Sequence, residues 1–277
     1  MRASLASTLG LIFALGGCAT QADIVGQAVV LADRGRYPEA EALLGRRLTA
    51  HPDDIAARRL LVRIDGLEGN LGRARTDAEA LAVRLGPASP LPWVELGHAL
   101  ELAHRYDEAL ELYDRAAEVA PRDPIGPKTG GMRSARWGEL DLARPRLEES
   151  LRRDARDAEV WHALGVVCLK LGDEAAAERA YRSGLVADPH ALENHVGLAT
   201  LAFVEERPDA ALREFDAVLA ERPKRTDAML GRSLALIELR RFDEAERTLS
   251  DAERGGADRA VVTKQRRLLA VLRSKAP

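Results

Sequence analysis

The side chains best suited to chemistry are six histidines and two cysteines, and their spacing matches no familiar catalytic or metal site. No two histidines form a His-x-x-x-His pair, and no cysteine lies beside them with the spacing of a zinc site. The chain has neither the Gly-x-Ser-x-Gly turn of a serine nucleophile nor the glycine-rich fingerprint of a dinucleotide site. Residues 126–131 are rich in glycine but lack the spacing and the preceding strand of a phosphate-binding loop. We therefore expect no catalytic residue, metal, cofactor or small-molecule substrate, and hence no enzyme.

The N-terminal residues indicate a signal peptide over residues 1–17. Arg2 precedes an apolar stretch from Leu5 to Leu15, which small residues follow. This stretch is too short to cross a bilayer core, which requires about 20 helical residues. A single basic residue, a short apolar segment and small residues in this order are typical of a secretory signal.

The end of this segment, Leu15-Gly16-Gly17-Cys18, resembles the lipobox of bacterial lipoproteins. In that family the cysteine becomes the first mature residue, and its thiol forms the thioether to diacylglycerol. The resemblance implies lipidation of Cys18; an ordinary secretory signal that happens to end in Cys is the alternative. Ala19 and Thr20 follow the cysteine, whereas Asp at this point favours retention in the inner membrane, so the resemblance implies the periplasmic face of the outer membrane.

The composition favours an all-α fold and gives no case for nucleic acid. Of the 277 residues, 46% are hydrophobic but only 4% are aromatic, which suits closely packed helices rich in Ala and Leu. The net charge is −3, and removal of residues 1–17, which hold one Arg and no acid, leaves −4. Nucleic-acid binding needs a clustered basic face. No polybasic cluster is evident that would suggest an anionic membrane surface either.

Internal periodicity is the strongest signal in the sequence. A series of alanines recurs every 34 residues, with one extra residue between the second and third members. The series consists of Ala40, Ala74, Ala109, Ala143, Ala177, Ala211 and Ala245. Trp93–Gly97 and Trp161–Gly165 both fit Trp-x-x-Leu-Gly, and Ala177 is followed by Tyr181 in an Ala-x-x-x-aromatic pattern.

These marks resemble the tetratricopeptide repeat, a pair of antiparallel helices that stacks on its neighbours. The resemblance implies a right-handed superhelical solenoid of about seven repeats, which we expect to form one domain over residues 18–277. The expected repeats are 21–54, 55–89, 90–123, 124–157, 158–191, 192–225 and 226–259, and a capping helix is expected over 260–273. We expect glycines at the turn inside four repeats (Gly35, Gly69, Gly138 and Gly172), prolines at the ends of second helices (Pro52, Pro121, Pro189 and Pro223), and Cys168 in the core.

The fourth repeat departs from the pattern. Its first helix contains Pro124, Gly126, Pro127, Gly130 and Gly131, and its second helix contains a proline at position 145. Each interior glycine weakens a helix by about 1 kcal/mol relative to Ala. We therefore expect a shortened or late-starting helix here. It represents either tolerated decay of one repeat, or a flexible joint or widened stretch of groove where a partner docks.

The resemblance also implies a binding groove lined by the first helix of each repeat. In this family the second, fifth, ninth and twelfth positions of these helices point into the groove. Carried over by position, the groove residues are Arg59, Arg63, Val94, His98, Glu101, Lys128, Met132, His162, Val166, Thr200, Phe203 and Leu234. Val94 and His98 stand where the family's carboxylate-clamp members have Lys and Asn, so that kind of grip on a peptide C-terminus is not expected. The mixture of apolar and basic groups suits an extended segment or a helix with an acidic edge.

The fold and the anchor lead to two binding hypotheses. The first is an envelope scaffold, similar to the tetratricopeptide lipoproteins that assist assembly of tight-adherence (Flp) pili, type IV pilus secretins or export systems for outer-membrane proteins and polysaccharides. The second is an adaptor that recruits a periplasmic peptidase or a peptidoglycan enzyme. The specific machine rests on analogy with the family alone.

Overall fold

The computed structural model describes residues 21–275, and this part of the chain forms fifteen helices and no strand. The all-α class expected from the sequence is therefore confirmed. The expected signal peptide and Cys18 lie outside the described residues. Within residues 21–275, no helix combines the length and the apolar content needed to cross a membrane.

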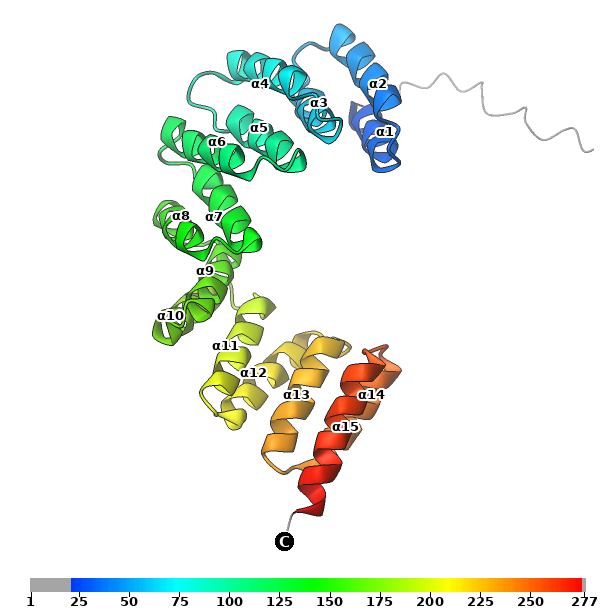
Figure 1. The fold of residues 1–277 in the computed structure, drawn as a ribbon, viewed down its shortest axis with the longest axis vertical. Coiled ribbons are helices and arrows are strands. Elements are labelled where there is room, and N and C mark those ends of the chain that lie inside the picture. The colour runs from blue at the N-terminus through cyan, green and yellow to red at the C-terminus, as the bar shows by residue number, and fades with distance from the viewer. Residues whose placement is uncertain (1–20, 276–277) are drawn as a thin grey trace, which may run out of the picture. The chain divides into compact units, whose positions relative to one another are not determined.

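Fourteen of these helices form successive antiparallel pairs, and α15 follows the last pair (Figure 1). The helices are α1 (Gln21–Asp33), α2 (Tyr37–Ala50), α3 (Ile55–Leu67), α4 (Leu71–Leu85), α5 (Leu91–Leu102), α6 (Tyr106–Val119), α7 (Ile125–Trp137), α8 (Leu140–Arg153), α9 (Ala158–Lys170), α10 (Glu174–Ala187), α11 (Leu192–Val204), α12 (Pro208–Glu221), α13 (Thr226–Glu238), α14 (Phe242–Arg254) and α15 (Arg259–Ser274).

The contacts divide the chain into two compact units, unit 1 over residues 1–112 and unit 2 over residues 113–277. In unit 1, α3 packs against α1, α2, α4 and α5. In unit 2, α9, α11 and α13 each pack on their own second helix and on the second helix of the pair before it, as α9 does with α10 and α8. The single domain over 18–277 stays a prediction.

The recurring alanines lie where the helices approach most closely. All seven, from Ala40 to Ala245, are fully buried, because a larger side chain at these crossings would separate the helices. Cys168 is also buried, 1% exposed, and packs among the apolar residues of α8, α9 and α10, as expected.

Every pair turns through one residue with positive φ. Glycine occupies this position in four pairs, with φ between 71° and 88° at Gly35, Gly69, Gly138 and Gly172. In the other three pairs the position is held by His104, Glu206 and Arg240, at φ 60°, 54° and 58°. Since side chains other than glycine rarely adopt this conformation, packing of the paired helices must impose it. The four prolines at repeat ends each follow the last residue of a second helix by two positions, as expected.

The expected shortening of the fourth repeat is wrong. Helix α7 runs over 13 residues and α8 over 14, as long as most other helices of the chain. The glycines of α7 permit close packing, because a Cβ at Gly126 would lie 2.5 Å from the backbone N of Ala117 and one at Gly131 would lie 2.8 Å from Leu147 Cγ. Pro145 sits on an exposed face of α8, where the loss of one backbone hydrogen bond does not break the helix.

Candidate protein-binding surface

In unit 1, two arginines of α3 converge on one carboxylate of α5. Arg59 Nε donates to Glu95 Oε1 at 2.7 Å, and Arg63 Nε donates to Glu95 Oε2 at 2.6 Å. The Glu95 side chain is fully buried, whereas those of Arg59 and Arg63 are 37% and 45% exposed. The buried carboxylate therefore holds both guanidinium groups in place, while the two arginine side chains remain partly exposed.

The electrostatics of this Arg59–Arg63–Glu95 cluster favour an anionic ligand. Burial by itself would raise the pKa of Glu95, but the neighbouring His98 and the hydrogen bonds from Arg63 and Arg59 outweigh it and lower that pKa to about 2. The carboxylate is thus ionised at neutral pH, and two guanidinium groups face one negative charge. Guanidinium groups bind carboxylates through two parallel N–H bonds, and prior fixation reduces the entropy lost on binding.

Three further residues expected in the groove lie beside this cluster on α5. His98 Nδ1 is 3.8 Å from Glu95 Oε2, and its side chain is 21% exposed. Glu101 is half-buried on the next turn. Val94 differs from the expectation, because it is only 3% exposed and contributes to the core.

Sequence reasoning missed Glu95, which anchors the cluster. It lies inside the Trp93–Gly97 motif, whose other residues are typical of helix packing, so the motif does not indicate a charged contact at Glu95. Sequence spacing could have indicated its role, since Glu95 follows Arg59 by 36 residues and Arg63 by 32 residues, which is about one repeat length. An acid one repeat after a pair of bases predicts an ion pair between neighbouring first helices.

In unit 2 the expected groove residues form a more neutral surface. Lys128 Nζ donates to Asp157 Oδ2 at 2.8 Å and to Glu159 Oε2 at 2.7 Å, so its charge is already balanced. Met132 is half-buried against the core around Tyr181. His162 lies over the Tyr181 ring, with 5.9 Å between ring centroids, and burial lowers its pKa.

The α11 residues of this surface are Thr200 and Phe203. Thr200 is exposed, and its hydroxyl donates to the Val196 carbonyl at 2.8 Å. Phe203 is half-buried against Phe215, with 6.1 Å between ring centroids. Unit 2 therefore offers apolar contact with little net charge, whereas unit 1 offers two fixed arginines.

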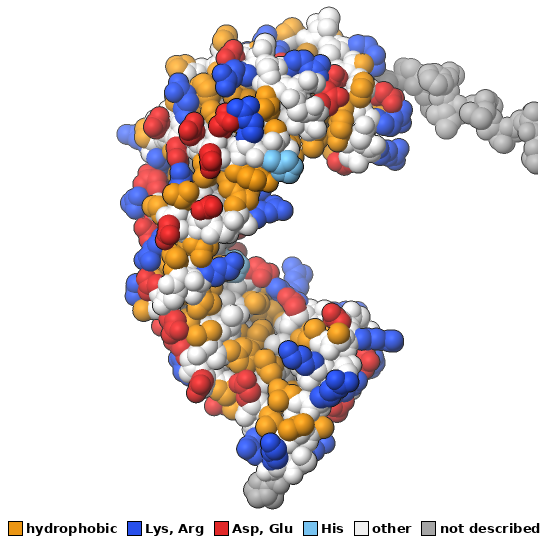
Figure 2. All heavy atoms as spheres, in the orientation of Figure 1, with side chains coloured by type: hydrophobic (Ala, Val, Ile, Leu, Met, Phe, Trp, Pro, Cys, Tyr) orange, Lys and Arg blue, Asp and Glu red, His pale blue; other side chains and the backbone are white. Residues whose placement is uncertain are grey.

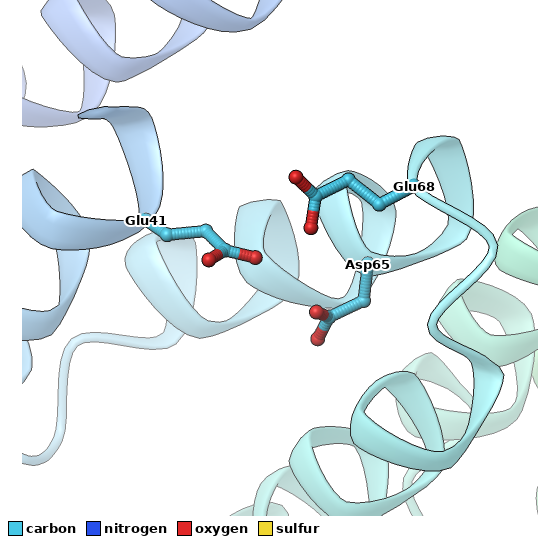
Figure 3. A group of neighbouring side chains, drawn as sticks. All are labelled: Glu41, Asp65 and Glu68. Carbon is cyan, nitrogen blue, oxygen red and sulfur yellow. The ribbon is translucent and has the colours of Figure 1, made fainter. Parts of the chain in front are cut away.

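Three carboxylates in unit 1 lie close enough to suggest a metal site, Glu41 of α2, Asp65 of α3 and Glu68 just after α3 (Figure 3). Arg73 already occupies this cluster. Its Nη2 lies 2.6 Å from Glu41 and 2.8 Å from Glu68, and its Nε lies 2.9 Å from Asp65. The guanidinium supplies the positive charge that a cation would bring, so the group is best described as a structural ion cluster.

Curated relatives match only part of the chain. Protein bimA of Emericella nidulans is 27% identical over 101 residues, 36% of this chain and 12% of that protein. Cilia- and flagella-associated protein 70 of Homo sapiens is 28% identical over 148 residues, 50% of this chain and 13% of that protein. The chain thus spans about an eighth of the length of these relatives.

Solved structures of repeat proteins resemble the fold over most of the chain. The C-terminal part of a tetratricopeptide repeat protein from Cytophaga hutchinsonii has a TM-score of 0.63 at 13% identity, covering 86% of this chain and 98% of that one. YrrB, described as having an unusual peptide-binding site, has a TM-score of 0.56 at 19% identity, covering 67% and 96%. PilW, a type IV pilus biogenesis factor, has a TM-score of 0.52 at 17% identity, covering 72% and 92%.

At these identities the structural likeness shows the fold alone. The family itself is shown by the tetratricopeptide repeat models, which match residues 90–123, 136–191 and 202–268. Repeats of this type indicate a protein–protein interaction scaffold, and the fold is typically non-enzymatic. The chain belongs to the tetratricopeptide repeat family.

Proposed function

We propose that this protein is a non-enzymatic scaffold that is held by a lipid on Cys18 at the periplasmic face of the outer membrane and assists assembly of an envelope machine such as a pilus or secretion apparatus. The signal-like N-terminus and its lipobox support the anchor. The tandem repeats support the binding role. The fold likeness to PilW, a type IV pilus biogenesis factor, supports the choice of machine.

The observation that carries the binding role is the cluster of Arg59, Arg63 and Glu95. Its two arginines are held by a buried carboxylate, and their side chains remain partly exposed. An acidic side chain, or the acidic edge of a helix, would complete the charge balance there. We therefore expect a partner that brings a carboxylate to unit 1.

Charge reversal at both arginines would be a poor test, because Glu95 would then face two further acids in a buried site. A better variant is Arg59→Gln/Arg63→Gln/Glu95→Gln, which removes the buried charge together with its partners. The matched control is Arg46→Gln/Arg75→Gln/Glu79→Gln, which changes the net charge equally at exposed residues of unit 1. Circular dichroism should show the same helicity and similar melting for both.

The measurement is recovery of partners after cross-linking in intact cells and purification from solubilised envelopes. We expect the control to recover the partners of the wild type, and the cluster variant to lose about 2 kcal/mol or more of binding free energy. Loss in both variants, or in neither, would show that the cluster does not bind the partner. Recovery of a peptidase or peptidoglycan enzyme in place of pilus or secretion components would select the adaptor role.

The anchor has a separate test. Mass spectrometry of the N-terminal peptide should find a lipid on Cys18, and Cys18→Ser should release the protein from the membrane fraction. A chain that still begins at Met1 and remains in the cytosol would contradict the proposed location without affecting the binding cluster.

A further inference from the structure

The last helix, α15, carries many basic side chains and no acidic one. Residues 259–275 contain six Lys or Arg and no Asp or Glu, in a chain whose net charge is −3. Two of these bases are paired with acids of α14, Arg266 with Glu246 and Arg273 with Asp243. The other four are exposed and have no ion pair with any residue in the described part of the chain: Arg259, Lys264, Arg267 and Lys275.

Aliphatic side chains lie between these bases on the outer side of the helix. Val261, Leu268 and Val271 are 37%, 39% and 50% exposed, whereas Val262 and Leu269 on the inner side are almost fully buried. Spacings of three and four residues place one set of side chains along a single face of α15, and Lys275 directly follows the helix. We call these residues the α15 face: Val261, Lys264, Arg267, Leu268, Val271 and Lys275. Over α15, Figure 2 shows mainly hydrophobic and basic side chains.

One position of this face shows that α15 is not built to receive another helix of the repeat type. In earlier pairs, a small residue of the first helix faces the second helix of the same pair, as Gly131 faces Leu147 and Gly165 faces Tyr181. From the third pair to the seventh this position recurs every 34 residues and is small each time: Gly97, Gly131, Gly165, Ala199 and Ser233. In α15 it is held by Arg267, which is exposed. A long charged side chain at the point of closest approach prevents the packing seen in the rest of unit 2.

We propose that the α15 face binds the anionic phospholipid headgroups of a bilayer surface. Unpaired bases attract the phosphates, while short aliphatic side chains between them can enter the boundary between headgroups and acyl chains. Lys and Arg stems add apolar area to the same layer. An acidic protein helix is the other ligand with suitable charge, but the long side chain of Arg267 would keep such a helix from packing closely against α15. The bases of the α15 face are not consecutive in the sequence, so they do not form an evident polybasic cluster there. The helix places them on one face.

The test uses a chain that lacks only residues 1–18, so that it carries every described helix and no lipid. Binding is measured by flotation with vesicles of phosphatidylglycerol and phosphatidylcholine in equal parts, and with vesicles of phosphatidylcholine alone. We expect binding to the anionic vesicles only, and weaker binding as salt increases. In Lys264→Gln/Arg267→Gln/Lys275→Gln, binding should fall about a hundredfold, since each base near an anionic surface contributes about fivefold.

The matched control is Lys170→Gln/Arg213→Gln/Lys224→Gln, which removes three exposed bases of unit 2 that lie outside α15. This control should bind as the wild type does, and both variants should keep the same helicity. Equal binding by the two variants, or equal binding to neutral vesicles, would overturn the proposal. The proposal would also be overturned if the wild type bound soluble polyglutamate through Lys264, Arg267 and Lys275 but did not bind the vesicles. These outcomes are independent of partner binding at Glu95.

Discussion

In unit 1 the buried polar residues include charged ones, whereas in the described part of unit 2 they are neutral. Unit 1 buries Arg47, Asp54, Asp65 and Glu95, and unit 2 buries Ser134, Ser150, Asn194, Ser233 and Thr248. Unit 2 instead fits aromatic rings against glycines: a Cβ at Gly165 or Gly197 would lie 2.4 or 2.3 Å from Tyr181 Cε1. Close fit at a glycine occurs in both units, since a Cβ at Gly66 would lie 2.6 Å from Ala99 Cα in unit 1. The buried charges distinguish unit 1, and the fit of an aromatic ring against glycines distinguishes unit 2. Unit 1 should therefore respond to charge and pH, and the ring contacts of unit 2 to added volume.

The largest effect is expected when Glu95 loses both of its arginines. In Arg59→Gln/Arg63→Gln, the fully buried carboxylate keeps its charge without a guanidinium partner, which should destabilise unit 1 by about 3 to 5 kcal/mol. Urea unfolding followed by circular dichroism measures the loss.

Addition of Glu95→Gln to these two substitutions should restore most of the lost stability, because the uncompensated charge is then absent. If the double and triple variants were equally unstable, lost packing of the arginine stems would be the cause, and buried charge would not distinguish the two units.

The pH dependence of unit 1 should show two opposite slopes. Burial raises the pKa of Asp65 from 3.8 to about 6, against the attraction of Arg73. The folded protein then binds this proton more readily than the unfolded chain, so the Asp65 contribution to stability falls by about 3 kcal/mol as pH rises from about 4 to 6. Glu95 has the opposite sign: its pKa of about 2 gives stability that is complete above the unfolded value and is lost as pH falls toward 2.

Asp65→Asn isolates the first of these slopes. This substitution should remove the decrease in the free energy of unfolding between pH 4 and 6. It should leave unchanged the loss of stability at lower pH that is due to Glu95. Urea unfolding at a series of pH values measures both. A slope that persists in Asp65→Asn would be assigned to the neighbouring Glu41 or Asp77, whose pKa values burial also raises.

Unit 2 should be more sensitive to one methyl group than to loss of a surface charge. In Gly197→Ala the new Cβ would press on the Tyr181 ring, which is itself 1% exposed, and we expect destabilisation of about 1 to 3 kcal/mol. Addition of Tyr181→Leu should make the double variant less costly than the sum of the single ones, as thermal unfolding can show.

The matched control is Gly72→Ala in α4, where a Cβ would meet nothing within 4 Å. It should stabilise the protein by about 0.5 to 1 kcal/mol through helix propensity alone. Destabilisation by both substitutions would mean that the close fit at Tyr181 has no special role.

The sequence predicts the repeat well because the constraints on the repeat are local. Burial of the seven alanines and positive φ at four glycines follow from spacing alone, since every copy repeats the same contact. For the fourth repeat, helix propensity predicts a weakened helix because it counts Gly126 and Gly131 as single residues. Their cost as single residues is offset by contacts with Ala117 and Leu147, which lie on neighbouring helices.

The candidate site is less predictable from the sequence. Position within the first helix predicts groove positions for Arg59, Arg63 and Val94 alike, but only the two arginines are partly exposed, whereas Val94 is buried. The position of a residue within the first helix of a repeat predicts only the average direction in which its side chain points. Whether that side chain reaches solvent depends on its length and on the size of its neighbours in adjacent repeats.

The smallest effect is expected at Lys128 of unit 2. Its ion pairs are partly exposed, so they can be compared with the buried ion pairs of Glu95 in unit 1. This lysine has two acidic partners, like Glu95 with its two arginines, but its side chain is 31% exposed and its ammonium can be solvated when a partner is lost. Lys128→Met should therefore change the free energy of unfolding by less than about 1 kcal/mol, because exposed pairs gain little over hydration. Urea unfolding beside Arg59→Gln/Arg63→Gln gives the direct contrast. A loss as large as that of the arginine variant would mean that the number of ion pairs, and not their burial, determines their contribution to stability in this fold.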